Sequence, residues 1–173
     1  MTRQSYATEI RIIRLMCTGR VDLAFILRAL EGGADGIFIG GCWPGECHYI
    51  TEGNYLALSM MHLCRKLLTL IGLDPQRLRL EWISAAEGSR FAEVMNDFSQ
   101  TVKSLGPLGE GEGLDDNILA FRLKTLQSMI AYIKLVEDKR LRVRLKSVEA
   151  VEAFYDSDEF DTMFRELIAD KLS

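Results

Sequence analysis

The sequence is short of the residues and motifs on which many enzymes depend. Only two histidines and three prolines occur among its 173 residues. It contains no P-loop and no G-x-G-x-x-G motif, the glycine-rich signatures of nucleotide-binding folds. It also contains no recognisable nucleophilic triad, so hydrolase chemistry has no support from the sequence.

Charge and hydropathy count against two further classes of protein. The net charge is -4, with acidic and basic residues interspersed, which gives no electrostatic support for nucleic-acid binding. No apolar stretch approaches the roughly 20 residues that span a bilayer. The first five residues lack the apolar core of a signal peptide. The sequence therefore predicts a cytoplasmic protein with no membrane span.

Cysteines are the residues whose chemistry goes beyond packing. Cys42 and Cys47 lie in a glycine-rich segment, residues 40–49, after an apolar strand-like run, and Cys17 ends an earlier strand-like run. In a reducing compartment, clustered thiols more often bind metal or carry out redox chemistry than form disulfides. Cys64 lies within an apolar helical pattern, where we expect a small core side chain.

Strand-like and helix-like segments alternate over the first 105 residues. The predicted strands cover residues 9–16, 36–40 and 78–83, and the predicted helices cover residues 21–30, 54–71 and 85–105. This order predicts an α/β fold, a small parallel three-layer sheet domain of Rossmann or flavodoxin type. Ligands of such sheets gather beyond the carboxyl ends of the strands. We therefore expect Cys17, Cys42 and the turn at residues 84–88 to converge, with Glu87 as a helix cap.

The chain changes character after residue 107. A glycine-rich linker, residues 108–113, separates the α/β domain, residues 1–107, from a mainly helical extension, residues 114–173. The predicted helices of the extension cover residues 114–134, 147–154 and 157–172, the last capped by Ser157. Residues 139–146 alternate basic and apolar, which favours a strand with one solvated face. A site for phosphate or for an acidic partner is the alternative.

The cysteines at the strand ends suit a soft-metal site. Thiolates are the common ligands of iron–sulfur clusters and of structural zinc. The C-x4-C spacing of Cys42 and Cys47, with Cys17 beside it, fits a cluster better than the tight C-x2-C spacing of structural zinc. Glycines allow close approach of the backbone and expose N–H groups that hydrogen-bond cluster sulfurs. His48 is a secondary candidate ligand. Structural zinc, thiol redox chemistry and unpaired thiols in a turn are the alternatives.

Several separate motifs resemble one known family. They cover residues 10–22, 33–36, 41–49, 52–55 and 79–88. Their order and spacing resemble the MvhD/FlpD family, the delta subunit of methyl-viologen-reducing hydrogenase, over about residues 8–107. The resemblance implies an iron–sulfur protein, usually with a [2Fe-2S] cluster. Such a protein relays electrons between an HdrA-like flavoprotein, which carries the FAD, and a hydrogenase, dehydrogenase or reductase subunit, often with flavin-based electron bifurcation.

The resemblance also implies the ligands. The family's ligand cysteines map onto Cys17, Cys42 and Cys47. Family members usually begin with a further strand and a C-x2-C segment, which does not occur here, so the predicted ligand set is incomplete. Cys64, His48 or a partner chain is the candidate for the missing ligand, and a truncated start is an alternative.

Two functions are therefore expected from the sequence. The first is an electron-transfer subunit of an oxidoreductase complex, with no substrate chemistry of its own and within an obligate hetero-oligomer. The second is a docking subunit whose cluster has been lost or which holds zinc. The resemblance does not choose among hydrogenase, benzoyl-CoA reductase and other complexes. Typical family members lack the extension after Gly109, which we expect to make complex-specific contacts.

Overall fold

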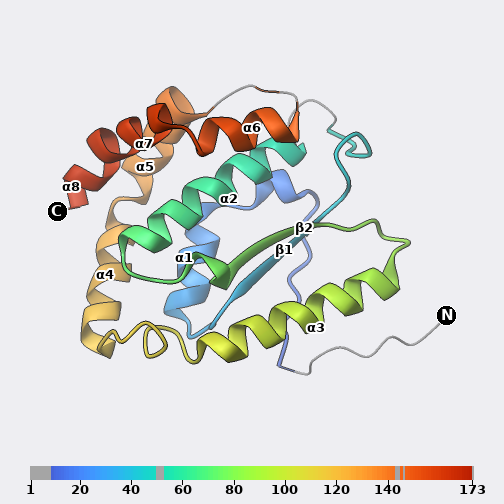
Figure 1. The fold of residues 1–173 in the computed structure, drawn as a ribbon, viewed down its shortest axis with the longest axis horizontal. Coiled ribbons are helices and arrows are strands. Elements are labelled where there is room, and N and C mark those ends of the chain that lie inside the picture. Colours follow the sequence, from blue (N-terminus) through green and yellow to red (C-terminus); the bar gives the residue numbers. More distant parts are fainter. Residues whose placement is uncertain (1–8, 50–52, 143–144, 146, 173) are drawn as a thin grey trace.

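The computed structural model describes residues 9–49, 53–142, 145 and 147–172 (Figure 1). In this part of the chain a parallel sheet lies at the centre, formed by β1 (Ile37–Gly41) and β2 (Leu78–Trp82), which pair along their whole length. Helix α2 (Gly53–Leu70) and helix α3 (Gly88–Leu105) lie on opposite sides of these strands (Figure 1). This three-layer α/β arrangement, followed by helices, confirms the predicted fold class.

The alternation of side chains along β1 explains the layers. The ring of Phe38 packs against Phe98 of α3, with ring centroids 5.6 Å apart. The next residue, Ile39, belongs to the main hydrophobic core, to which α2 contributes. Successive side chains of a strand point to opposite faces. A strand with large apolar residues at consecutive positions is therefore covered on both sides.

Helix α1 (Leu23–Glu31) has clear start and stop signals. The carboxylate of Asp22 accepts the backbone N–H of Ala24 at 2.8 Å, which satisfies one of the free donors of the first turn. The core positions of the helix recur three or four residues apart and are Leu23, Ile26, Leu27 and Leu30. The helix ends at Gly32, and Gly33 then adopts a φ of 87°, where glycine is favoured. This matches the predicted helix to within two residues at each end.

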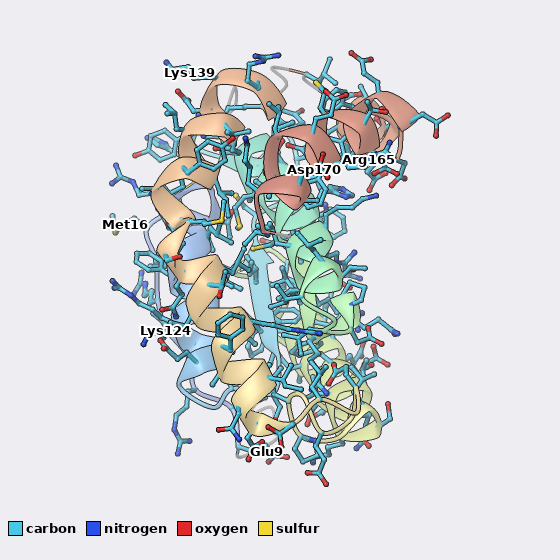
Figure 2. All side chains as sticks on the ribbon, turned by 90° about the vertical axis from the view of Figure 1, so that its left-hand side faces the viewer. Glu9, Met16, Lys124, Lys139, Arg165 and Asp170 are labelled. Carbon is cyan, nitrogen blue, oxygen red and sulfur yellow. The ribbon has the colours of Figure 1, made fainter. Side chains whose placement is uncertain are left out.

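The extension is helical and continues the same core. Its elements are α4 (Asp116–Ser128), α5 (Ile130–Val136), a π-helical turn (Glu137–Leu141), α6 (Val148–Tyr155), α7 (Asp158–Phe164), a second π-helical turn (Arg165–Ala169) and α8 (Asp170–Leu172). Helix α4 packs against α1, and α5 continues the line of α4 (Figure 2). Helix α6 packs along α2, where Tyr155 stacks on His62 at 5.2 Å. The predicted Ser157 cap is confirmed, since its hydroxyl accepts the N–H of Phe160.

A buried ion pair fixes the glycine-rich linker to the sheet. Arg77, directly before β2, has a fully buried side chain, and its Nε lies 2.5 Å from a carboxylate oxygen of Glu112. The same guanidinium donates to the backbone carbonyls of Asp35, Gly106 and Pro107. Burial acts to raise the pKa of Glu112, but the hydrogen bonds from Arg77 and from backbone N–H groups hold that pKa below its ordinary value. The linker is therefore a folded part of the domain.

Two predicted strands are wrong within the described residues. Residues 9–16 form no strand, and the side chains of Ile13 and Met16 are 83% and 93% exposed. A strand needs a neighbour for its backbone N–H and C=O groups, and β-propensity alone does not supply one. Residues 139–141 belong to the π-helical turn, and residues 143, 144 and 146 lie outside the described part. Arg142 bonds to Glu137 and Asp138, so the basic residue after this turn pairs along a helical segment and not across a sheet.

The remaining differences concern helix ends. The predicted helix at residues 114–134 is divided at Met129, whose φ and ψ of -95° and 0° interrupt it. The predicted helix at residues 85–105 begins at Gly88, because the preceding residues form a turn. No helix in the described residues has both the length and the apolar character needed to span a membrane.

Replacing Glu112 by Gln should destabilise the fold, because it leaves the charge of Arg77 buried without a counter-ion. We expect the free energy of unfolding at pH 7 to fall by about 3 kcal/mol, measured by urea denaturation. The matched control is Asp161→Asn, which removes the exposed pair with Lys66 and should cost at most about 1 kcal/mol.

The same pair predicts the direction of a pH dependence. The pKa of Glu112 is lowered by folding, so its contribution is complete above the ordinary carboxyl pKa and is lost as the pH falls through the lower folded value. The stability gap between wild type and Glu112→Gln should therefore narrow as the pH falls below about 4.5. A gap that stays constant into the acid range would contradict this assignment.

Candidate metal centre at the start of helix α2

Cysteine thiols from separate segments gather at the N-terminus of α2. A Cβ atom placed on Gly53, the first residue of the helix, would lie 2.6 Å from the Sγ of Cys47 and 3.1 Å from the Sγ of Cys17. Because both distances are measured from the same point, the distance between the Cys17 and Cys47 sulfurs cannot exceed their sum. The side-chain amide nitrogen (Nδ2) of the next residue, Asn54, lies 2.5 Å from the carbonyl oxygen of Cys42 and 3.9 Å from the Sγ of Cys42. Two consecutive residues therefore contact all three cysteines.

Two glycines make this arrangement possible. A Cβ on Gly19 would lie 2.8 Å from the carbonyl oxygen of Gly53, so the two backbones are in direct contact. Gly19 belongs to the short 3-10 turn (Thr18–Arg20) that follows Cys17. Any side chain at Gly19 would push this turn away from α2, and any side chain at Gly53 would occupy the space beside the sulfurs. The absence of a Cβ at both positions keeps Cys17 beside Cys47.

The helix itself favours negative charge at this point. The described part of helix α2 is 18 residues long and has no acidic side chain in its first turn. The N-terminus of a helix carries free N–H groups and the positive end of the helix dipole, which stabilise anions such as thiolates. Cys47 is buried, whereas Cys17 and Cys42 are half-buried. The site is therefore shielded from water but close to the surface.

The turn after β2 also reaches the cysteine loop, as the sequence predicts. The indole Nε1 of Trp43 donates to a carboxylate oxygen of Glu87 at 2.7 Å, and the backbone N–H of Ser84 donates to the same oxygen at 2.6 Å. These hydrogen bonds lower the pKa of Glu87. The guanidinium of Arg90 lies over the Trp43 ring, 5.2 Å from its centroid. Glu87 occupies the N-cap position, but its side chain makes no cap bond there, so the predicted capping role is wrong.

The two other candidate ligands, Cys64 and His48, lie in different environments. Cys64 is 1% exposed and belongs to the hydrophobic core, about three turns along α2 from Gly53. Burial raises the pKa of its thiol well above the ordinary value. The predicted core role of Cys64 is thus confirmed, and its place in the core argues against its being the missing ligand. His48 is exposed, and its ring packs edge-on against Tyr49 at 5.2 Å.

The donor set suits part of an iron–sulfur cluster better than a single metal ion. Within the described residues, no three His, Cys, Asp or Glu side chains surround one point in a way that would hold one ion. An iron–sulfur cluster with more than one iron distributes its ligands over separate atoms, so its thiolates need not surround one point. The hydroxyl of Thr18, the residue after Cys17, is also buried without a hydrogen-bond partner among the described residues.

The cysteines can be found from the sequence, but the residues that position them cannot. Gly53 and Asn54 fall in the motif at residues 52–55, where the sequence predicts only the beginning of a helix. The signal that could have found them is a polar residue directly after a glycine at a helix start. Gly19 and Thr18 gave no signal beyond their place next to Cys17.

The fold is a small α/β domain in which three cysteines lie near the start of α2, beyond the end of β1, an arrangement typical of metal-binding and redox proteins. The family described as methyl-viologen-reducing hydrogenase, delta subunit (FlpD), matches residues 1–106, and the chain belongs to this family. The extension, residues 114–173, lies outside this match.

Relatives fall into two kinds. An F420-non-reducing hydrogenase iron-sulfur subunit of Archaeoglobus profundus is 52% identical over 105 residues, which cover 61% of this chain and 76% of that protein. An F420-non-reducing hydrogenase vhc iron-sulfur subunit of Methanococcus voltae is 47% identical, covering 61% of this chain and 72% of that protein. A ferredoxin/F(420)H(2)-dependent CoB-CoM heterodisulfide reductase subunit of Methanosarcina acetivorans is 50% identical over 109 residues, 63% of this chain but 14% of that protein.

The geometry of the thiols predicts which pair a short bifunctional thiol reagent will cross-link. In metal-free protein, Cys17 and Cys47 should be linked in preference to either pair that includes Cys42, as read by peptide mapping with mass spectrometry. Gly53→Ala should reduce the rate of this cross-link severalfold, because its Cβ would fill the space beside both sulfurs.

The matched control for this experiment is Gly88→Ala. Gly88 also begins a helix, but a Cβ there meets nothing within 4 Å, so the cross-linking rate should not change. Equal rates in wild type and Gly53→Ala, or a dominant link to Cys42, would contradict the proposed packing around Gly53.

Proposed function

We propose that this protein is an electron-transfer subunit that holds a [2Fe-2S] cluster with Cys17, Cys42 and Cys47. The observation that carries the proposal is the gathering of these thiols at the N-terminus of α2 in a member of the FlpD family. A bound cluster would supply reversible one-electron transfer. The chain's own part is to hold the thiolates, to stabilise their charge and to limit their contact with water.

Three cysteines leave one position of a four-thiolate cluster to be filled. Cys64 lies too far along α2 to fill it. His48, on the surface next to Cys47, or a residue of a partner chain is the remaining candidate. Ligation from a partner would make cluster assembly depend on the complex.

Partner association is supported by two observations. Residues similar to this chain make up 14% of the Methanosarcina acetivorans heterodisulfide reductase protein, so a domain of this kind occurs covalently joined to a larger subunit of such a complex. Ile12, Ile13 and Met16, just before Cys17, are more than half exposed, and Met16 projects from the surface in Figure 2. Exposed apolar groups next to a functional site are typical of protein interfaces.

We infer from these observations a cytoplasmic hetero-oligomer. In it the protein relays electrons between an HdrA-like flavoprotein, which carries the FAD, and a hydrogenase, dehydrogenase or reductase subunit. Electron bifurcation would take place at the flavin of the partner. This chain would supply a path to or from the flavin and would carry out no substrate chemistry.

A docking subunit that has lost its cluster, or that holds zinc, is the second candidate. The observation that favours loss of the cluster is that no three metal-ligating side chains surround one point in the described residues. The same observation counts against a zinc ion held by this chain alone, because structural zinc takes four ligands. Such a subunit would keep the partner contacts of the family and would use its cysteines only for packing or for zinc.

Metal analysis of the intact complex, purified without oxygen, separates the two candidates. We expect iron and acid-labile sulfide in wild type. Cys17→Ser, Cys42→Ser and Cys47→Ser should each lower the iron content severalfold and slow electron transfer, because each removes a thiolate ligand.

Cys64→Ala is the matched control, because it removes a thiol from α2 without touching the site. It should lower thermal stability, by creating a core cavity, and leave the iron content per folded complex unchanged. Zinc in place of iron, or serine variants that transfer electrons at the wild-type rate, would refute the electron-transfer proposal and favour the docking subunit.

A further inference from the structure

We propose that Asn54 and Thr18 set the reduction potential of the cluster by donating hydrogen bonds to sulfur at this site. The inference rests on the proposed function and assigns a role to two residues that are not themselves ligands. Both are positioning and tuning residues, since their side chains act on the sulfurs and not on a substrate.

The amide of Asn54 is directed at a single cysteine. The residue is 3% exposed, and its Nδ2 donates to the carbonyl oxygen of Cys42 and lies 3.9 Å from the Sγ of the same residue. An asparagine amide nitrogen carries two N–H groups. One bond to the carbonyl fixes the side chain, and the second N–H is available to the sulfur.

The hydroxyl of Thr18 is a donor without an acceptor in the described residues. Its Oγ1 is buried and lies 2.9 Å from the position that a Cβ of Gly41 would occupy. Gly41 directly precedes Cys42, and Thr18 directly follows Cys17. An unsatisfied buried hydroxyl costs free energy. A thiolate or sulfide next to this hydroxyl would accept a hydrogen bond from it and remove that cost.

The expected effect on the potential has a definite sign. Reduction adds negative charge to the cluster and its sulfurs, and a donated hydrogen bond stabilises the more negative state more strongly. Removing a donor should therefore make the cluster harder to reduce. Because Asn54 contacts Cys42 directly, its loss should have the larger effect.

The test is a redox titration of the intact, iron-loaded complex, followed by electron paramagnetic resonance of the reduced cluster. In Asn54→Leu, we expect the ratio of reduced to oxidised cluster at a fixed poise to fall about tenfold, a shift of about 59 mV for a one-electron couple. Thr18→Val keeps the shape of the side chain and loses the hydroxyl. It should shift the ratio in the same direction by a smaller factor.

Ser59→Ala is the matched structural control. Ser59 is buried on α2 like Asn54, but it shares a hydrogen bond with Tyr155, away from the thiols. Its loss should lower the melting temperature without moving the potential. If Asn54→Leu fails to load iron, Asn54→Ala, which loses the N–H donors without adding a charge, should shift the ratio in the same direction.

The outcomes distinguish this inference from the proposed function. Wild-type complex without iron and sulfide overturns both. Iron-loaded wild type and variants with equal potentials overturn only the tuning role of Asn54 and Thr18. A shift in Ser59→Ala as large as that in Asn54→Leu also overturns it, because the effect would then come from general loosening of α2.

Discussion

The direct contact between the backbones of Gly19 and Gly53 is the constraint on which the site depends. It presses the turn after Cys17 against the first residue of α2. With no side chain on either glycine, the sulfurs of Cys17 and Cys47 meet in the space that remains. A methyl group at either position would push the turn after Cys17 away from the start of α2, because no covalent bond holds these two segments together. The cysteines supply the thiols, but Gly19 and Gly53, which have no side chains, determine where the sulfurs of Cys17 and Cys47 come together.

Helix α2 connects this site to the rest of the fold. Its first two residues contact the three cysteines, while its later turns supply much of the hydrophobic core, including Cys64 and Leu67. One rigid element therefore carries both the thiol geometry and the stability of the domain. The positive end of its dipole falls where thiolate charge would develop. Because the cysteines contact the first turn of a long core helix, the packing of that helix also fixes the position of the thiols.

The sequence allowed the fold class, most helix bounds and the candidate cysteines to be predicted, because these depend on local patterns. Apolar spacing and glycine stops define α1 and α2, and the end of β1 places Cys42 at one edge of the sheet. Residues 9–16 failed because a strand is defined by its neighbours, and its own pattern could not show that none is present in the described residues. Asn54 was missed because burial of a polar side chain is a tertiary property. The π-helical turn at residues 137–141 was missed because pairing of Arg142 with acidic residues overrode the alternating pattern.

One end of the sheet carries the linker attachment and the opposite end carries the cysteine loop. Arg77 stands before the first residue of β2 and joins the linker to the domain through Glu112, whereas Cys42 follows the last residue of β1. Five residues of strand place about 17 Å between these ends. The linker thus attaches the extension far from the thiols, but α6 packs along α2 and Lys134 of α5 pairs with Asp22, close to the turn after Cys17. Structural changes in the linker or in α4 can therefore alter the contacts of this subunit without moving the sulfurs. Structural changes that shift α2 would move the sulfurs, because the first residues of α2 contact the cysteines. The core helix, and not the linker, therefore links partner contacts to the potential of the site.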